Sequence, residues 1–195
     1  TQELAPLLIG RTPDHISAFH HAAERRTRHN PSAKAALDIA LHDLLAKQYD
    51  MPLFSLLGGR FHKVLNLPSV ISMLDPDEMA RQAEEACRQG FDSIKIKLGD
   101  APEADIERIA RVREAISAET SLRVDANQGW SAKQALKVIN ESRSYHVDWY
   151  EQPVFIENLD ALARVTRATD AVIMADEPIH GTRDMLQLIR LGAAD

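Results

Sequence analysis

The sequence predicts an α/β fold in which a parallel sheet follows a helical region, and three observations support this prediction. From about residue 64 onward, short β-rich runs alternate with helical patterns five times, in units of about 25 residues. Such alternation is typical of parallel strands joined by crossover helices. Before residue 64 the pattern is helical throughout, and polar residues recur at the ends of successive predicted strands.

The first region, residues 1–63, is expected to contain two main helices. The stretch 14–29 is a polar helix rich in histidine and arginine, and Asn30-Pro31 ends it because such turn residues interrupt helices. The next helix, 33–48, carries apolar residues at i, i+3 and i+4 spacing. This spacing predicts an apolar stripe along one face of that helix.

The second region, residues 64–195, divides into five β-α units. In chain order, the predicted strands are 64–73, 93–98, 122–125, 147–151 and 172–176, and the helices are 76–89, 103–117, 131–142, 159–168 and 182–191. Gly90 is expected just after the C-terminal end of the first of these helices, and Ser131 at the N-terminal cap of the third, because these residue types are favoured there.

Polar residues recur at the same place in successive units. Asp125 follows Lys97 by 28 residues, Glu151 follows Asp125 by 26, and Asp176 follows Glu151 by 25. Each stands at the carboxyl end of its predicted strand, so a sheet that curls into a barrel would bring the four side chains together at its mouth. An open doubly wound sheet would instead spread them along a line.

The number of units also bears on the architecture. A complete (β/α)₈ barrel has eight strands in about 250 residues, so five units cannot close one. We therefore expect the first part of a barrel, truncated after the fifth β-α unit. The alternative is an open five-stranded sheet that is complete by itself.

The three acids predict a metal site. Carboxylates brought together repel one another, and a divalent cation removes that conflict. An all-oxygen set of ligands suits Mg²⁺, or Mn²⁺ as the alternative, rather than Zn²⁺. Asp125, Glu151 and Asp176 are thus the predicted metal ligands, in place of ordinary loop acids paired with arginine or lysine.

The strand around Ser93 predicts a pair of lysines on one face. Strand periodicity puts Lys95 and Lys97 together and the intervening isoleucine on the opposite face. Two neighbouring ammonium groups should lower a lysine pKa toward the range of a working base. Lys97, nearer the end of the strand, is the predicted catalytic residue, and Lys95 is expected to lie deeper as its electrostatic partner.

Three further residues border this predicted site. Asn127 and Glu177 flank the metal-ligand candidates and are expected to support them, and His180 is a candidate substrate contact. Together the set suits abstraction of a proton alpha to a substrate carboxylate, with the resulting enediolate stabilised by the metal.

Composition excludes several other classes of protein. The chain has 195 residues, of which 45% are hydrophobic. Its net charge of −6 disfavours nucleic acid and anionic membranes as partners. There is no apolar run of about 18 residues of the kind that spans a bilayer. A single cysteine, Cys87, cannot form an internal disulfide, and the first ten residues lack a signal-peptide pattern. We therefore expect a cytoplasmic protein.

These motifs, in this order, resemble the enolase superfamily and specifically the muconate-lactonizing-enzyme subgroup of its mandelate racemase/muconate lactonizing enzyme family. The resemblance covers nearly the whole chain. The segments that carry it are Lys95-x-Lys97, Asp125-x-Asn127, Glu151-Gln152-Pro153, Asp176-Glu177, the helix segment 36–44 and Leu56-Leu57-Gly58-Gly59. The amino-acid sequences of segments 125–130 and 150–154 most resemble those of dipeptide epimerases and N-acylamino acid racemases.

The resemblance implies a fold and an activity. It implies the helical part of a capping domain in residues 1–63 and a modified (β/α)₇β barrel from residue 64. It further implies Mg²⁺ at Asp125, Glu151 and Asp176, Lys97 as an acid/base, a small carboxylate substrate such as a dipeptide or an N-acylamino acid, and a homo-oligomer.

Two alternatives stay open at this point. The family carries a second lysine on the next strand, and the chain ends before that position. Racemisation needs a base on each face of the alpha carbon, whereas a muconate-type cycloisomerase needs only one proton donor, so the sequence does not choose between them. The alternative of another class is an inactive barrel fragment that needs a partner chain.

Overall fold

The computed structural model describes residues 2–195 and separates them into two compact units that divide between Leu65 and Asn66. None of the helices in that range combines the length and apolar character needed to cross a membrane.

The first unit is built from helices. It contains a short 3₁₀ helix, η1 (Ala5–Leu7), and the helices α1 (Ile16–Arg26), α2 (Pro31–Gln48) and α3 (Leu53–Leu56). A small core of Leu4, Phe19, Ala23 and Leu41 joins η1, α1 and α2. The predicted apolar stripe along α2 is only partly buried: Leu41 lies in this core, whereas Leu44 is 54% exposed.

The second unit contains five parallel strands that pair in chain order, β1-β2-β3-β4-β5, within the described residues. The strands are β1 (Ser69–Ile71), β2 (Ser93–Lys97), β3 (Ser121–Asp125), β4 (Trp149–Glu151) and β5 (Ile173–Met174). The helices are α4 (Pro76–Arg88), α5 (Pro102–Ala115), α6 (Ala132–Glu141), α7 (Leu159–Arg167) and α8 (Thr182–Leu191), with a 3₁₀ turn η2 (Arg143–Tyr145).

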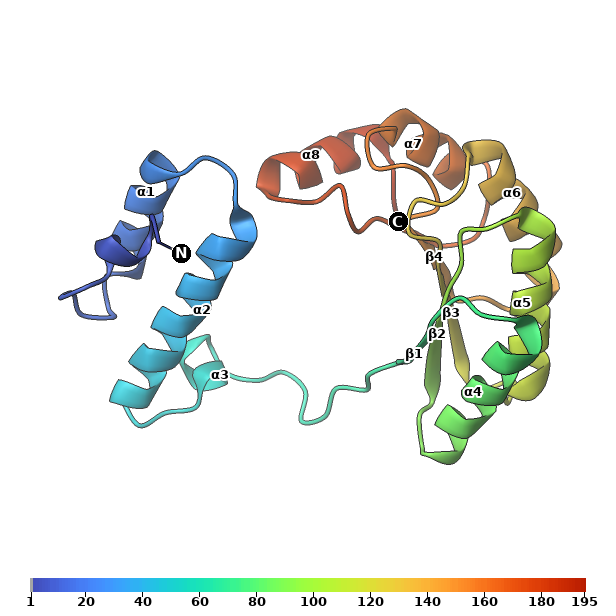
Figure 1. Cartoon of the computed structure of the whole chain (residues 1–195), viewed down its shortest axis with the longest axis horizontal. Coiled ribbons are helices and arrows are strands. Elements are labelled where there is room, and N and C mark those ends of the chain that lie inside the picture. Colours follow the sequence, from blue (N-terminus) through green and yellow to red (C-terminus); the bar gives the residue numbers. More distant parts are fainter. Residues whose placement is uncertain (1) are drawn as a thin grey trace. The chain divides into compact units, whose positions relative to one another are not determined.

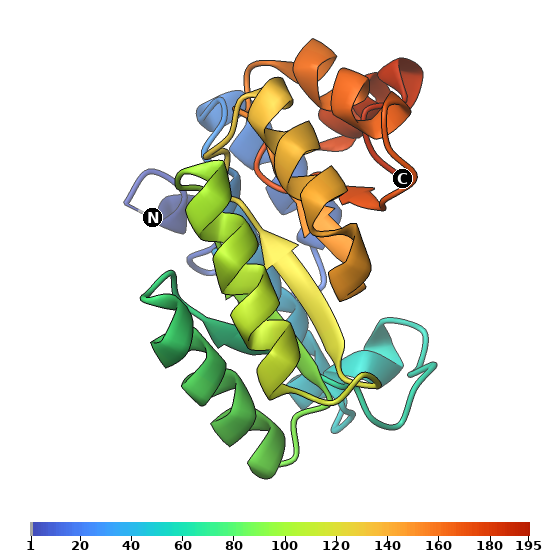
Figure 2. The same cartoon turned by 90° about the vertical axis from the view of Figure 1, so that its right-hand side faces the viewer.

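The order of the strands and the position of the helices identify a barrel arc. Helices α4, α5 and α6 lie along one side of the sheet, and the helices follow one another around an arc to α8 (Figure 1). Figure 2 looks onto this layer of helices, with the strands behind it. A doubly wound sheet reverses its strand order and carries helices on both faces. The predicted α/β fold with parallel strands is therefore confirmed, and the arc is favoured over the open doubly wound sheet.

Side-chain alternation gives the sheet two different faces. The helix-covered face consists of side chains that are at most 2% exposed: Ile71, Ile94, Ile96, Leu122, Val124, Tyr150 and Ile173. Full burial of one such aliphatic side chain stabilises the fold by about 1.5–3 kcal/mol. The opposite face carries Lys95, Lys97, Arg123, Asp125, Trp149 and Glu151 at the alternate positions. Burial of the apolar face thus fixes which way the charged side chains point.

Three strands are shorter than the sequence predicts by two residues or more. The expected strand 64–73 is reduced to Ser69–Ile71. Pro68 has no amide to donate to a ladder, and Val64 and Leu65 before it are about three-quarters exposed, at 75% and 74%. The strands expected at 147–151 and 172–176 begin or end two residues inside those bounds. Asp176 consequently lies in the loop after β5.

Two glycines allow the loops after β2 and β3 to touch through their backbones. A Cβ atom on Gly129 would lie 2.4 Å from both the Cα and the carbonyl oxygen of Gly99. Gly99 itself has a φ of +127°, and its Cβ would lie 2.6 Å from the Ala126 oxygen. No larger residue fits this contact without separating the two loops.

We predict that Gly129→Ser destabilises the chain by about 1–3 kcal/mol, because the loops must move apart to admit the side chain. The matched control is Gly181→Ser, since a Cβ there would meet no atom within 4 Å and the backbone is extended. The control should change stability by no more than about 0.5 kcal/mol. Urea denaturation monitored by circular dichroism measures both, and equal midpoints would contradict the prediction.

Candidate active site

Parallel register brings the charged strand ends side by side. Lys97 pairs with Asp125 across β2 and β3, and Asp125 pairs with Glu151 across β3 and β4. The ladder continues past the strands, because the amides of Leu98 and Ala126 donate to the Asp125 and Glu151 carbonyls at 2.8 and 3.0 Å. The main chain therefore holds the three side chains in one row.

The side chains in this row form a connected ion-pair cluster. Lys95 Nζ donates to both oxygens of Glu151 at 2.8 and 2.7 Å and lies 2.9 Å from Asp125 Oδ2. Lys97 Nζ donates to the same Asp125 oxygen at 2.6 Å. The Lys95 side chain is 18% exposed and that of Lys97 34%, so Lys95 is the deeper of the two.

Burial and charge shift the pKa values of this cluster in opposite directions. Burial would raise the pKa of Asp125, but hydrogen bonds from Lys97, Lys95 and the Asn127 amide outweigh it and hold that pKa below its usual range. Burial raises the pKa of Glu151, and the charges of Asp125 and Asp176 raise it further, against hydrogen bonds from Lys95. Negative charge is therefore crowded around Glu151.

The expectation that two adjacent ammonium groups lower a lysine pKa is wrong for Lys95. Burial does disfavour its charged form, but hydrogen bonds to Glu151 and Asp125 outweigh burial, and the pKa of Lys95 is raised. The carboxylates lie within hydrogen-bond distance of the ammonium, so they stabilise its charge more strongly than burial opposes it.

The remaining predicted residues lie in the loops after β3 and β5. Asn127 Nδ2 and Gln128 Nε2 both donate to Glu177 Oε1, at 3.2 and 3.3 Å, which joins the two loops. Asp176 and His180 are exposed. The His180 amide donates to Asp184 Oδ2 at 3.0 Å, which fixes the start of α8.

Gln152 is a residue whose role the sequence did not indicate. Its side chain is fully buried, accepts from the Asp176 amide at 3.0 Å and donates to the Val154 carbonyl at 2.9 Å. Its φ is +38°, and Asn127 and Gln128 are also left-handed, with φ of +41° and +71°. Left-handed non-glycine residues are uncommon and concentrate at functional sites. Asn127 and Gln128 lie just after β3, and Gln152 directly follows β4, so all three stand beside the predicted site residues Asp125 and Glu151.

Asp105 is a second residue that sequence reasoning missed. It is fully buried in the first turn of α5, with Ile109 and Val112 as the other buried residues of that helix. This i, i+4, i+7 spacing is the signal that could have placed it on the buried face.

The donor set of the cluster fits a hard divalent cation. Asp125, Glu151 and Asp176 offer only carboxylate oxygens, which Mg²⁺ and Mn²⁺ prefer, and a cation would relieve the crowding that raises the pKa of Glu151. Within residues 2–195, however, no three His, Cys, Asp or Glu side chains are arranged to hold a metal ion as they stand. The ammonium groups of Lys95 and Lys97 instead contact the oxygens of Asp125 and Glu151.

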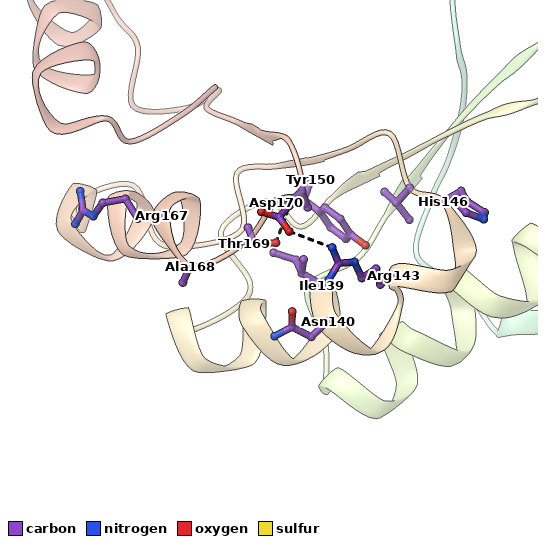
Figure 3. A pocket seen from close by; sticks show the side chains of 11 residues that line it. Ile139, Asn140, Arg143, His146, Tyr150, Arg167, Ala168, Thr169 and Asp170 are labelled. Atoms are coloured by element: carbon purple, nitrogen blue, oxygen red, sulfur yellow. Dashed lines mark hydrogen bonds and ion pairs between the residues drawn. The ribbon is translucent and has the colours of Figure 1, made fainter.

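A separate cavity of about 420 Å³ lies beside the segments that lead into β4 and β5 (Figure 3). None of the predicted site residues lines it. Arg143, one of its lining residues, pairs with Asp170 at 3.0 Å, and both side chains are largely exposed. This cavity is at the end of the strands opposite the carboxylates.

Comparison with known protein families identifies the chain. Residues 78–195 match the enolase C-terminal domain-like family, and residues 1–58 match the mandelate racemase/muconate lactonizing enzyme N-terminal domain. The chain belongs to the mandelate racemase/muconate lactonizing enzyme family of the enolase superfamily. The predicted family resemblance is therefore confirmed.

Known members of this family are similar over nearly the whole chain. It is 37% identical to N-succinyl-L-Arg/Lys racemase from Bacillus cereus over 98% of this chain and 52% of the relative. It is 34% identical to a chloromuconate cycloisomerase from Pseudomonas putida over 98% of this chain and 52% of the relative. These relatives are isomerases, and the chain spans about half the length of the curated relatives it matches.

A solved structure from the family shows the same fold. The dipeptide epimerase from Enterococcus faecalis, crystallised with Mg and the dipeptide L-Leu-L-Tyr, superposes with a TM-score of 0.95. It is 37% identical in sequence, and the match covers 98% of this chain and 54% of that one.

We predict that Lys95→Met makes the chain more responsive to Mg²⁺. Loss of the ammonium leaves Glu151 without a cation and Asp125 with Lys97 alone, which should cost about 1–3 kcal/mol of unfolding free energy. Mg²⁺ binding to the folded state should then restore stability. Thermal unfolding with and without Mg²⁺ measures the effect.

The control variant is Lys137→Met, whose ammonium pairs with Glu103 on the surface. Its Mg²⁺-induced change in Tm should equal that of the wild type, whereas that of Lys95→Met should be larger. A Lys95→Met variant with no greater response to Mg²⁺ than the control would refute the competition between ammonium and metal.

Proposed function

We propose that the protein containing this chain is a Mg²⁺-dependent isomerase that removes the proton alpha to a substrate carboxylate. The observation that carries this proposal is the single row of Lys97, Asp125 and Glu151, in which a cationic side chain and two buried carboxylates share one open face of the sheet. The family membership of the chain supports it.

Each charged residue of the candidate site has a proposed role. Asp125, Glu151 and Asp176 would hold Mg²⁺, which supplies charge to bind the substrate carboxylate and to stabilise the negative charge that develops on it. Lys97, the more exposed lysine, would accept the proton from the alpha carbon while the electrons of the C–H bond move toward the carboxylate. Lys95 stays charged and holds Glu151 and Asp125 in place.

Asn127, Glu177 and His180 have smaller proposed roles. Asn127 and Glu177 join the loops after β3 and β5 and so would steady Asp125 and Asp176. His180 is exposed in the same loop as Asp176 and would contact the substrate.

For the substrate, we propose a dipeptide or an N-acylamino acid. The racemase and the dipeptide epimerase that match this chain act on such compounds by their names. The chloromuconate cycloisomerase match keeps a cycloisomerase as the second candidate, at lower identity. We also propose that the protein is a cytoplasmic homo-oligomer.

We predict that the protein expressed from its full gene exchanges the alpha proton of its substrate with deuterium in D₂O. A library of dipeptides and N-acylamino acids, followed by NMR, tests this expectation and names the substrate. Lack of exchange with every member, together with turnover of a muconate, would favour the cycloisomerase.

We further predict that Lys97→Ala lowers alpha-proton exchange by at least about 10²-fold, because it removes the proton acceptor. Its affinity for Mg²⁺, measured by calorimetry, should survive. Asp125→Asn, in contrast, should weaken the binding of Mg²⁺, because it replaces one of the proposed metal ligands. Retained exchange in Lys97→Ala would remove this lysine from the proposed role.

A further inference from the structure

Asp105 combines complete burial with an unusual set of partners. Its side chain is 0% exposed and accepts four hydrogen bonds. Oδ1 accepts from Arg108 Nη1 at 2.7 Å. Oδ2 accepts from the amides of Gly99 and Asp100 at 3.0 and 2.8 Å, and from Trp130 Nε1 at 2.9 Å. Arg108, in the same helix, therefore neutralises the charge of Asp105 through Oδ1, and Oδ2 accepts from groups outside α5.

The partners of Oδ2 come from the two loops that follow the site strands. Gly99 lies two residues after Lys97, and Trp130 lies five residues after Asp125. Where Asp105 joins them, the loops are already in backbone contact through Gly99 and Gly129. A single buried carboxylate thus ties the end of β2 to the end of β3.

Trp130 extends this connection to a third strand. It is 2% exposed, its amide donates to the Pro153 carbonyl at 3.1 Å, and it forms a parallel bridge with Val154. Pro153 follows Glu151 by two residues. The loops after β2, β3 and β4 are therefore linked through Asp105 and Trp130.

Comparison with other helix starts shows that this is not ordinary capping. Asp75 caps α4, Ser131 caps α6 and Asn158 caps α7, and each of these side chains accepts from an amide two or three residues further along the chain. Asp105 instead accepts from amides five and six residues before it and from an indole 25 residues away. A buried carboxylate costs several kcal/mol unless it is fully hydrogen-bonded, so its place between these loops calls for a role beyond the start of α5.

We propose that Asp105 is a positioning residue that sets where Lys97 and Asp125 lie in the reaction. This inference rests on the function proposed above. Lys97 Nζ and Asp125 Oδ2 are 2.6 Å apart, and a misplacement of about 1 Å at an active site can cost about 10²-fold in rate. A carboxylate that fixes both loops controls that separation without touching the substrate.

The test compares Asp105→Asn with Glu103→Gln in the protein expressed from its full gene. Both substitutions turn a carboxylate in the first turn of α5 into an amide, but Glu103 is exposed and paired with Lys137 on the surface. Asparagine keeps the shape of the aspartate and places an NH₂ group against one set of donors. Trp130→Phe is the second variant, because it removes only the Nε1 donor and some ring volume.

Three measurements are made on each variant: kcat and KM for alpha-proton exchange, Mg²⁺ affinity by calorimetry, and hydrogen exchange of individual amides. For Asp105→Asn we expect kcat to fall by about 10²-fold with KM within about twofold, and Mg²⁺ affinity to fall by about 10- to 100-fold. The Gly99 and Asp100 amides should exchange faster, while the amides of the β3 core keep their protection. Glu103→Gln should match the wild type throughout.

Two results would overturn the proposal. One is a kcat and a Mg²⁺ affinity for Asp105→Asn equal to those of Glu103→Gln. The other is a loss of protection spread evenly over the whole second unit, which would show a structural role alone. If Asp105→Asn does not fold, the same criteria apply to Trp130→Phe. A wild-type protein without isomerase activity would contradict the proposed function. The Mg²⁺ affinity and the hydrogen exchange of the variants would still test whether Asp105 positions the two loops.

Discussion

The structure of the second unit depends on the two-residue alternation of side chains along parallel strands. One face of the sheet is apolar and buried beneath the helices, so register cannot slip by one residue without exposing that face. Because Ile94, Ile96 and Val124 are committed to the core, Lys95, Lys97 and Asp125 must lie on the other side. The energy that folds the barrel arc also orients the groups of the candidate site.

That orientation brings charges together in a partly buried row, where a carboxylate that loses its neighbouring cation costs several kcal/mol of free energy. Asp125 and Glu151 are only 1% and 8% exposed as side chains, so each needs a cation. In this structure the lysine ammonium groups meet that need. The same carboxylates suit a divalent metal, and we propose that such a cation would compete with the lysines for them.

Much of this could be predicted from the sequence, and the reasons are physical. The β-α alternation and the spacing of Lys97, Asp125, Glu151 and Asp176 depend on local periodicity, which one sequence displays. Strand ends depend on ladder partners, so the length of β1 and the loop position of Asp176 could not be found this way. The expected lowering of a lysine pKa fails at Lys95, because the nearest charges are carboxylates on strands 30 and 56 residues away. Asp105 and Gln152 were missed because a buried polar residue reveals its partners only in three dimensions.

The proposed metal site is tested most directly by a crystal structure of the protein grown with Mn²⁺ and measured at the manganese absorption edge. We predict one anomalous peak within bonding distance of carboxylate oxygens of Asp125, Glu151 and Asp176, with Lys97 free of Asp125 and directed at the open face of the sheet. A peak elsewhere, or carboxylates still bound only to the lysines at saturating Mn²⁺, would contradict it.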